Sequence, residues 1–414
     1  MNFKILPTKN KLKIFNDPIY GFITIPNSLI FDIIQHKYFQ RLRRISQMGL
    51  SYLVYPGAHH TRFHHALGCM HLMQKAVNVL RFKGVEISDE EENGLLIAIL
   101  LHDIGHGPFS HAMEHSIVND VSHEEISLRF MEELNKEFNG SLTLAISIFK
   151  GEYPRRFMCE LISSQLDMDR ADYLKRDSFY TGVAEGNINS ERLITMLNVV
   201  DDQLLIEEKG ILSVEKFLIA RRFMYWQVYM HKTGVVAEQL LMGILRRAKE
   251  LVLQDVKLNC SQALYYFLHS EINEQTFNAK TLTIFSKLDD FDIVAAMKDW
   301  ANHEDFVLSN LCQMILNRDL LKIKVKNKPM KISDLNSHSQ ALMNKYNISQ
   351  HEADYFVFTG ELTNQAYQNT SQKINVLFKS GKIKDIVKAS DQLNLKALSK
   401  PITKYYMCYP KKKM

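Results

Sequence analysis

A continuous apolar segment that ends in a histidine and an aspartate constrains the fold of this chain most strongly. Residues 95–101 are seven apolar residues in a row, and His102 and Asp103 follow them directly. Ser88 and Glu91 have the spacing of a capping box, which predicts that a helix begins just before this segment. A bilayer span requires about 20 apolar residues. The pattern therefore predicts a buried helix whose C-terminal end presents an imidazole and a carboxylate.

Helical periodicity dominates the chain up to about residue 318. Apolar residues recur at three- and four-residue spacing from Ser28 to Met48 and from Arg62 to about Lys83. Residues 13–27 alternate around Pro and Gly instead, which predicts a short β element. Ser122 and Glu125 form a second capping box at the start of another helix. Further helices are expected near residues 156–177, 190–200, 213–250, 261–269 and 303–317.

From about Leu320 the pattern changes to the alternation that is typical of strands. It appears in the segments LLKIKVKNKPMKI, ADYFVFTGEL and KINVLFKSGKI, which are separated by Gly and Asn. We therefore expect a mainly α protein with a short N-terminal β element and a smaller C-terminal α+β region.

Composition narrows the class of protein. With 46% hydrophobic and 23% charged residues, the chain has the usage of a globular protein. The N-terminal residues MNFKILPTKNKLK lack an apolar signal core. Five cysteines stand far apart without a CxxC pair, which favours a reducing compartment. We expect a cytoplasmic protein with no membrane partner, and its net charge of +5 fits anionic ligands without requiring them.

Histidine is concentrated in one part of the chain. Ten of the sixteen histidines lie from His59 to His123, and the segment HDIGHGPFSH places two of them, His106 and His111, in a Gly-rich turn after His102. A lone His-Asp pair is more often a helix end with a satisfied histidine. The neighbouring histidines and a downstream carboxylate, Asp169, favour a divalent metal site instead, because imidazole nitrogen and carboxylate oxygen are both good ligands.

The segment that contains Asp169 has a second feature. Asp169, Tyr173 and Asp177 are spaced i, i+4 and i+8, so they lie on one face of a predicted helix. An acid, an aromatic ring and a second acid on one face suit a metal ligand followed by two groups that contact a bound molecule.

At this level of detail the chain resembles the HD phosphohydrolase superfamily, and within it the deoxynucleoside-triphosphate (dNTP) triphosphohydrolase branch, whose animal members carry a SAM domain beside the HD domain. The resemblance covers residues 10–240 well and 280–325 more loosely. It implies an HD-domain helical bundle, with residues 1–250 as the catalytic domain and 251–414 as a helical, then α+β, region for regulation or oligomerisation. The shared segments are KIFNDPIYG, FQRLRRISQMG, VYPGAHHTRFHHALG, LLHDIGHGPFSH, SHEE and DMDRADYLKRD.

The resemblance implies hydrolysis of a dNTP to a deoxynucleoside and inorganic triphosphate, by attack at the α-phosphorus. It implies one Fe, Mn, Co, Zn or Ni ion and Mg²⁺ with the triphosphate. The implied metal ligands are His65, His102, Asp103 and Asp169. The implied catalytic residues are His106, His111, Glu114 and His123, with His111 as the acid. The implied substrate-binding residues are Gln47, Arg62, Arg170, Tyr173, Asp177, Arg221 and Tyr229.

In this branch Gln47 and Asp177 would bind the 3′-hydroxyl, and Tyr173 would leave no room for a ribose 2′-hydroxyl. A homo-oligomer, either a dimer or a tetramer, and activation by a dNTP or NTP are also implied. The residues that match the regulatory site are Lys13, Asn16, Gln35, Gln40, Arg41, Arg43, His231 and Lys232. Three positions depart from the animal members: His64 replaces a Glu, Tyr225 replaces a His, and Gln35 replaces the Asp that reads guanine.

Several alternatives stay open at this stage. The arginines of the regulatory set could instead make structural ion pairs, His123 could be a capping-turn histidine, and Tyr229 could be a core aromatic. An HD phosphohydrolase could act on cyclic, alarmone or monophosphate nucleotides. A nucleotide-sensing or nucleic-acid-binding module is a third class, but a net charge of +5 over 414 residues is weak support for binding single-stranded nucleic acid.

Overall fold

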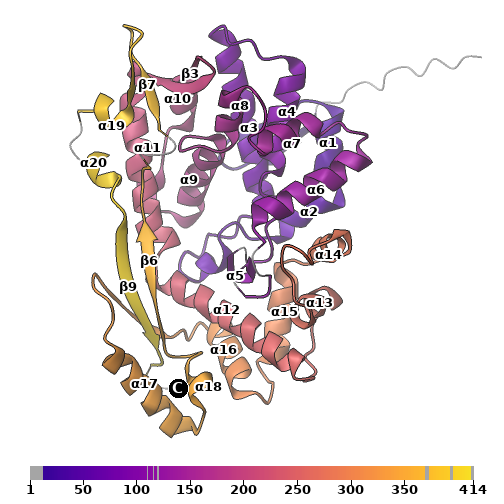
Figure 1. Ribbon diagram of the computed structural model, residues 1–414, viewed down its shortest axis with the longest axis vertical. Coiled ribbons are helices and arrows are strands. Elements are labelled where there is room, and N and C mark those ends of the chain that lie inside the picture. The colour runs from indigo at the N-terminus through magenta and orange to yellow at the C-terminus, as the bar shows by residue number, and fades with distance from the viewer. Residues whose placement is uncertain are drawn as a thin grey trace, which may run out of the picture.

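The computed structural model describes residues 13–109, 111–114, 116–118, 121–368, 373–391 and 395–411 (Figure 1). The fold is mainly α, as predicted, with small β-sheets at the N-terminus and in the C-terminal part. None of the helices in these residues is both long enough and apolar enough to cross a bilayer.

The predicted N-terminal β element is a hairpin. Strands β1 (Lys13–Asp17) and β2 (Gly21–Ile25) pair antiparallel, and Asp17 accepts hydrogen bonds from the backbone N–H groups of Ile19 and Tyr20 in the turn. The helical segment that follows is broken at His36, whose backbone is extended. Its parts are α1 (Ser28–Gln35), α2 (Lys37–Gln40) and the 3-10 turns η1 (Arg41–Arg44) and η2 (Gly49–Leu53).

Helices α3 (Arg62–Phe82), α4 (Asp89–Leu101) and α9 (Met168–Thr181) form the centre of the bundle, where α3 packs against both of the others (Figure 1). The capping box of Ser88 and Glu91 opens α4 as predicted, and that of Ser122 and Glu125 opens α6. Around this centre lie α6 (His123–Glu137), α7 (Thr143–Phe149) and α8 (Arg156–Ile162), whereas α5 (His111–Glu114) packs against α12 (Lys232–Leu253).

Three of the predicted helices are interrupted. The helix expected at 156–177 breaks between α8 and α9, where Asp167 caps α9 by accepting from the N–H of Arg170. The helix expected at 190–200 is wrong beyond residue 195, because β3 (Leu197–Val200) pairs with β4 (Gln203–Glu207) after α10 (Ser190–Thr195). The helix expected at 213–250 is divided into α11 (Ile211–Met224), a π-helical turn η5 (Tyr225–Tyr229) and α12 (Lys232–Leu253).

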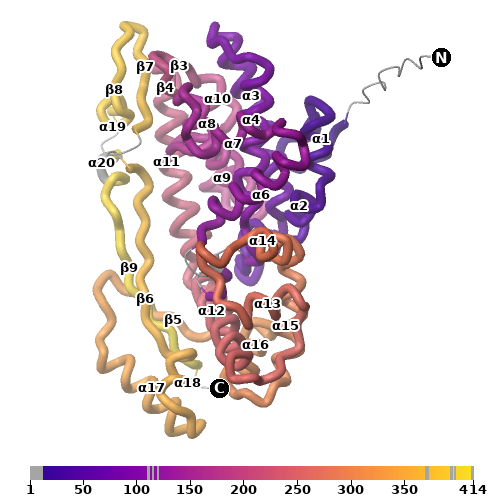
Figure 2. Tube along the Cα trace, turned by 45° about the vertical axis from the view of Figure 1, so that its right-hand side comes forward, coloured from indigo at the N-terminus to yellow at the C-terminus, as the bar shows by residue number. Residues whose placement is uncertain are grey.

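The C-terminal part is helical and then α+β, as predicted. Strands β5, β9 and β6 form one antiparallel sheet, and β6 and β9 run side by side along an edge of the molecule (Figure 2). Strand β7 pairs in parallel with β4, which joins this part to the sheet of β3 and β4. The elements are α13 (Gln262–His269), α14 (Ala279–Phe285), α15 (Asp290–Trp300), α16 (Phe306–Leu316), β5 (Lys322–Lys326), α17 (Ile332–Tyr346), α18 (Gln350–Ala353), β6 (Phe358–Asn364), β7 (Asn375–Leu377), β8 (Ile383–Asp385), α19 (Ile386–Ala389), α20 (Leu395–Leu398) and β9 (Ile402–Tyr409).

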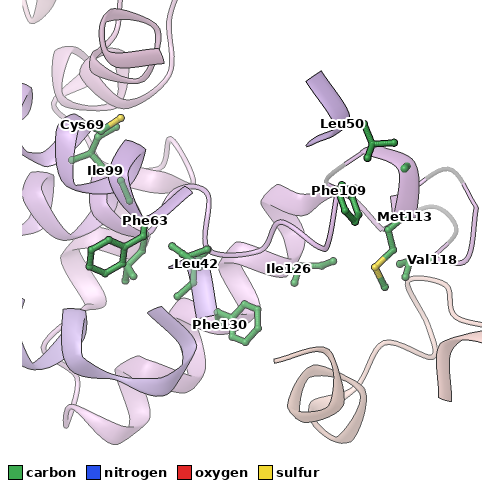
Figure 3. Packing of buried hydrophobic residues seen from close by; sticks show 14 of the residues in the cluster. Leu42, Leu50, Phe63, Cys69, Ile99, Phe109, Met113, Val118, Ile126 and Phe130 are labelled. Atoms are coloured by element: carbon green, nitrogen blue, oxygen red, sulfur yellow. The ribbon is translucent and has the colours of Figure 1, made fainter. Parts of the chain in front are cut away.

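One buried hydrophobic cluster runs through the bundle. Figure 3 shows some of its members, including Phe63 and Cys69 from α3, Ile99 from α4 and Met113 from α5. The apolar segment of α4 is buried throughout, since residues 94–101 all lie inside. The last turn of α4 is therefore fixed in the interior, and the two residues that follow it are fixed with it.

Candidate metal centre and ligand cavity

The first turn of α3 holds His65, the metal ligand that the resemblance implies, next to His64. His64 turns back on the helix end, where its Nδ1 accepts a 3.2 Å hydrogen bond from the N–H of Thr61. His65 is fully buried and points into the bundle. Its Nε2 lies 3.1 Å from Oδ1 of Asp169 and 3.7 Å from Oδ2 of Asp103. The geometry therefore places His65, and not His64, in the cluster.

The other members of the cluster come from the end of α4 and the start of α9. Nε2 of His102 lies 3.3 Å from Oδ1 of Asp103 and 3.6 Å from Oδ1 of Asp169. The four residues that the resemblance implies as metal ligands thus converge from three elements. Two imidazoles and two carboxylates then face one another.

The hydrogen bonds of the two histidines leave the nitrogens that face the carboxylates available. Nδ1–H of His65 donates to Asp172 at 2.8 Å, and Nδ1–H of His102 donates to the carbonyl of Ile99 at 2.7 Å. Both Nε2 atoms then point into the cluster, and Nε2 of His102 is buried without a hydrogen-bond partner among the described residues. This donor set fits a divalent cation, because a ligating histidine is usually held by its other ring nitrogen in this way.

A cysteine that the sequence analysis missed lies beside these ligands. Sγ of Cys69 is 3.5 Å from Nδ1 of His65, one helical turn away on α3. Donor atoms of His65, Cys69, His102 and Asp169 all lie within 4.8 Å of one another. Burial raises the pKa of the Cys69 thiol, so the sulfur is protonated and is a weak ligand in this state.

A chain of buried charges supports His65 from behind. Arg176 donates two hydrogen bonds to Asp172, at 2.8 and 3.0 Å, and a third to Asp17 of the β-hairpin at 2.8 Å. Burial raises the pKa of Asp172, but the Arg176 charge and the bond from His65 outweigh it and lower that pKa to about 2. The carboxylate is therefore ionised and orients the imidazole.

The loop after Asp103 is held by a buried arginine and a buried aspartate. Arg41 has no exposed surface and donates to the carbonyls of His106 at 2.7 Å, Ile104 at 3.3 Å and Leu288 at 2.9 Å. Asp290 accepts from the N–H groups of Ser46 at 2.8 Å and Phe109 at 2.9 Å. The expectation that Arg41 contacts a regulatory nucleotide is thus corrected, because its guanidinium has no surface left for a ligand.

Beside the cluster lie cationic and imidazole groups. Arg62 donates to Asp103, and the ring of His106 stacks on His123 at 3.8 Å between centroids. Burial and the Arg62 charge hold the pKa of His106 well below its ordinary value, so this ring is neutral at pH 7. The side chains of His111 and Glu114 lie outside the described part of the structure, although their backbone forms α5.

Two further arginines, Arg170 and Arg221, have buried nitrogen atoms that donate no hydrogen bond to the described residues. Arg170 pairs with Asp167 but keeps its buried Nε without a partner among the described residues. Arg221 has two such atoms, Nε and Nη1, and its guanidinium lies 6.0 Å from the ring centroid of Tyr225. Partly buried guanidinium groups with unused donors suit an anionic ligand.

A cavity of about 520 Å³ opens beside the cluster and holds most of the predicted substrate residues. Six of the seven line it; Arg221 does not, although it lies beside Tyr225. Tyr225, which the sequence marked as a departure, and Glu238, which it missed, also line it. The lining residues are Gln47, Met48, Gly49, Leu50, Ser51, Arg62, Asp103, His106, Phe109, Ala112, His123, Asp169, Arg170, Tyr173, Asp177, Tyr225, Tyr229, Gly234, Glu238 and Leu241.

The remaining residues of the predicted regulatory set lie away from this cavity. Arg43 donates to Gln40 at 2.9 Å and covers the ring of Phe63 at 3.6 Å, while His231 caps α12 through the N–H of Thr233. Four others are exposed on the surface: Lys13, Asn16, Gln35 and Lys232. The set therefore comes from two separate parts of the chain, one around α1 and the other at the start of α12.

Comparisons with known proteins agree with this geometry. Residues 62–177 match the HD domain, and residues 188–267 match the HD associated region. The uncharacterized protein YwfO of Bacillus subtilis is 38% identical over 320 residues, which are 75% of this chain and 71% of that protein. The deoxynucleoside triphosphate triphosphohydrolase SAMHD1 homolog of Dictyostelium discoideum is 31% identical over 284 residues, covering 62% of this chain and 55% of the relative. The crystal structure of a phosphohydrolase from Bacteroides thetaiotaomicron superposes with a TM-score of 0.94 at 52% identity, covering 97% of this chain and 100% of that one.

Proposed function

The chain belongs to the HD-domain family of phosphohydrolases, and on that premise we propose that it hydrolyses dNTPs to deoxynucleosides and inorganic triphosphate. The observation that carries this proposal is the cavity of about 520 Å³. It connects Asp103 and Asp169 of the cluster to two arginines and to a polar and aromatic wall around Tyr173. A triphosphate and a sugar can therefore occupy it together.

His65, His102, Asp103 and Asp169 would hold a divalent cation, and the mixed nitrogen and oxygen set suits Fe, Mn, Co, Zn or Ni. When bound, such an ion supplies positive charge for phosphate oxygens and makes water more acidic. The protein's own contribution is to orient these ligands through Asp172 and the carbonyl of Ile99.

Arg62, Arg170 and Arg221 would bind the polyphosphate, since guanidinium groups fit phosphate oxygens with two parallel hydrogen bonds. The unpartnered Nε atoms of Arg170 and Arg221 support this role. The accompanying Mg²⁺ would neutralise further phosphate charge. His106 and His123 line the same cavity. The leaving 5′-oxygen needs a proton, and His111 with Glu114 is the proposed source of that proton.

The sugar end of the cavity supports a deoxyribose substrate. Gln47 and Asp177 line it beside the rings of Tyr173 and Tyr229, which meet edge to face with centroids 6.0 Å apart. Oε1 of Gln47 is buried without a hydrogen-bond partner among the described residues. A hydroxyl on the ligand would satisfy it, whereas the Tyr173 ring would crowd a 2′-hydroxyl.

We also propose that a nucleotide regulates the protein through the surface residues Lys13, Asn16, Gln35, Gln40, Arg43, His231 and Lys232, and that copies of the chain form a dimer or tetramer. Residues 251–414 would serve this assembly, with residues 1–250 as the catalytic domain, in a cytoplasmic setting. Sedimentation of the protein with and without each dNTP tests this, and an unchanged monomer in every mixture would contradict it.

Product analysis tests the central proposal. The protein is incubated with Mn²⁺ or Mg²⁺ and each dNTP, alone and in mixtures, and the products are separated by chromatography. Deoxynucleoside and triphosphate are expected, with far less product from NTPs, dNMPs or cyclic nucleotides. A monophosphate with pyrophosphate, or a preference for another nucleotide class, would overturn the proposal. The His102→Ala/Asp103→Ala double variant, in which two proposed ligands are missing, is the control for contaminating hydrolases.

A further inference from the structure

We propose that His60 is a positioning residue: its ring fixes the carboxylate of Asp177, its backbone holds the loop of Gln47, and it thereby sets the sugar selectivity of the cavity. This inference rests on the proposed function and deepens it. His60 is 1% exposed and is absent from the cavity lining, so it acts through Asp177 and Gln47 and not by touching the nucleotide.

The first connection runs through the His60 ring. Nε2–H of His60 donates to Oδ1 of Asp177 at 2.7 Å, and the hydroxyl of Tyr229 donates to Oδ2 at 2.8 Å. Each carboxylate oxygen is thus held by one donor, which fixes the plane of the carboxylate. Because a carboxylate has about four acceptor positions, Asp177 can still accept a hydrogen bond from a ligand in the cavity.

The second connection runs through the His60 backbone. The N–H of Gln47 donates to the carbonyl of His60 at 3.0 Å. This bond ties the loop that carries Gln47 to the same residue whose ring holds Asp177. The two cavity residues lie far apart in the chain, on a loop before α3 and on α9, yet one residue links them.

His60 is itself held firmly. Its ring stacks on Tyr180 at the end of α9, with centroids 4.3 Å apart and an angle of 15° between the planes. Gly57 brings the loop close to the same point, because a methyl group there would lie 2.6 Å from the carbonyl oxygen of Tyr180. Three groups are therefore held together: the loop of His60, the end of α9 and the Asp177 carboxylate.

This arrangement explains how the cavity can discriminate between sugars. A site that hydrogen-bonds a substrate hydroxyl rejects an analogue without it, because the polar groups of the site are then left unpaired. That penalty depends on the groups being held, since a free carboxylate can turn to another partner or to water. Without the His60 bond, Asp177 is held on one side only, and the penalty for a missing 3′-hydroxyl falls.

The test compares three variants with the wild type. His60→Phe keeps a ring on Tyr180 but removes the donor, and His60→Gln returns an amide N–H near the position of Nε2. His59→Ala is the matched control, because His59 is the exposed neighbour and stacks on Tyr52 instead. For each protein, kcat/KM is measured for dTTP and for 2′,3′-dideoxy-TTP, together with the affinity of the metal-free protein for both by calorimetry.

We expect the preference for dTTP to fall by about tenfold or more in His60→Phe, while His60→Gln restores most of it and His59→Ala leaves it unchanged. An equal loss for both nucleotides in His60→Phe would show a merely structural role and overturn the inference. Should His60→Phe not fold, His60→Asn, whose shorter side chain does not reach Asp177, gives the same comparison. A wild type that hydrolyses no dNTP would refute the proposed function instead, and the calorimetric preference then tests His60 independently.

Discussion

The substitution Gly68→Ala sets the general preference of helices against a specific contact in this protein. Gly68 lies in the middle of α3, where alanine is ordinarily more favourable than glycine by about 1 kcal/mol. A methyl group there would lie 2.1 Å from Oδ1 of Asp172 and 2.3 Å from Nη2 of Arg176. Non-bonded atoms need about 3.5 Å, so the buried ion pair would have to withdraw by roughly 1 Å or more.

Disrupting a buried ion pair costs about 3–5 kcal/mol. After the gain in helix preference, we expect Gly68→Ala to destabilise the protein by about 2–4 kcal/mol. For a chain of 414 residues this corresponds to a Tm lower by about 2–5 °C. Because Asp172 orients His65, the affinity for a divalent metal should also fall by about tenfold or more.

Gly243→Ala is the matched control, because Gly243 also lies within a helix, α12, and its added methyl group would meet ordinary contacts at 3.4 and 3.6 Å. Its Tm should rise by about 1 °C. Differential scanning fluorimetry measures both proteins, and metal titration measures the affinity. An equal rise in Tm for the two variants, with unchanged metal affinity, would refute the argument that the Asp172–Arg176 pair is rigidly held.

Three further predictions address the same region and its surroundings. Arg41→Ala leaves three buried carbonyls without their donor, so it should cost about 3 kcal/mol or more in a denaturant titration, whereas Arg43→Ala should cost at most about 1 kcal/mol; equal effects would contradict the assigned burial. His65→Ala should lose the bound metal as measured by elemental analysis, while His64→Ala should retain it and lose only a helix cap worth about 1 kcal/mol; the reverse result would mean that the assignment of the two histidines is mistaken. Burial raises the pKa of Asp305, but the hydrogen bonds from Arg247 outweigh burial and lower this pKa below its unfolded value. The stability that the Asp305–Arg247 pair contributes is therefore present above the unfolded pKa of about 4 and is lost as the pH falls through the folded pKa. The Asp305→Asn variant should therefore have a lower Tm at pH 7 than the control Asp299→Asn, and its Tm should fall less when the pH is lowered to 3. Parallel Tm curves for the two variants from pH 7 to 3 would contradict this prediction.

Much of the local architecture could be predicted from the sequence. The capping boxes at Ser88 and Ser122, the buried helix before His102 and the short β element near residues 13–27 all rest on interactions within a few residues. Helices α7, α14, α15 and α17 were not predicted, and the helix expected at 190–200 was wrong past residue 195. Residues 197–200 form a strand because β4 pairs with them, and strand pairing is poorly encoded in a single segment.

In the candidate site, too, some residues could be predicted from the sequence and others could not. The resemblance implied His65, His102, Asp103 and Asp169 as metal ligands, and the structure brings these four side chains together. The supporting residues carry no such signal: Arg176 and Asp17 are 159 positions apart, and His60 and Asp177 are 117 apart. Cys69 could have been noticed, since it follows His65 by one helical turn.

The sequence by itself determined that this protein is mainly helical, and it indicated a candidate metal site among the histidines and aspartates near residues 65, 103 and 169. The resemblance already favoured His65 over His64, and the tertiary structure shows how the two differ: His64 caps a helix, whereas His65 faces the carboxylates. Only the tertiary structure decided that Arg41 holds a loop and not a ligand. The physical reason is the range of the interactions. Helix periodicity and capping act over three or four residues, whereas burial and hydrogen-bond partners depend on segments that meet only after the chain has folded.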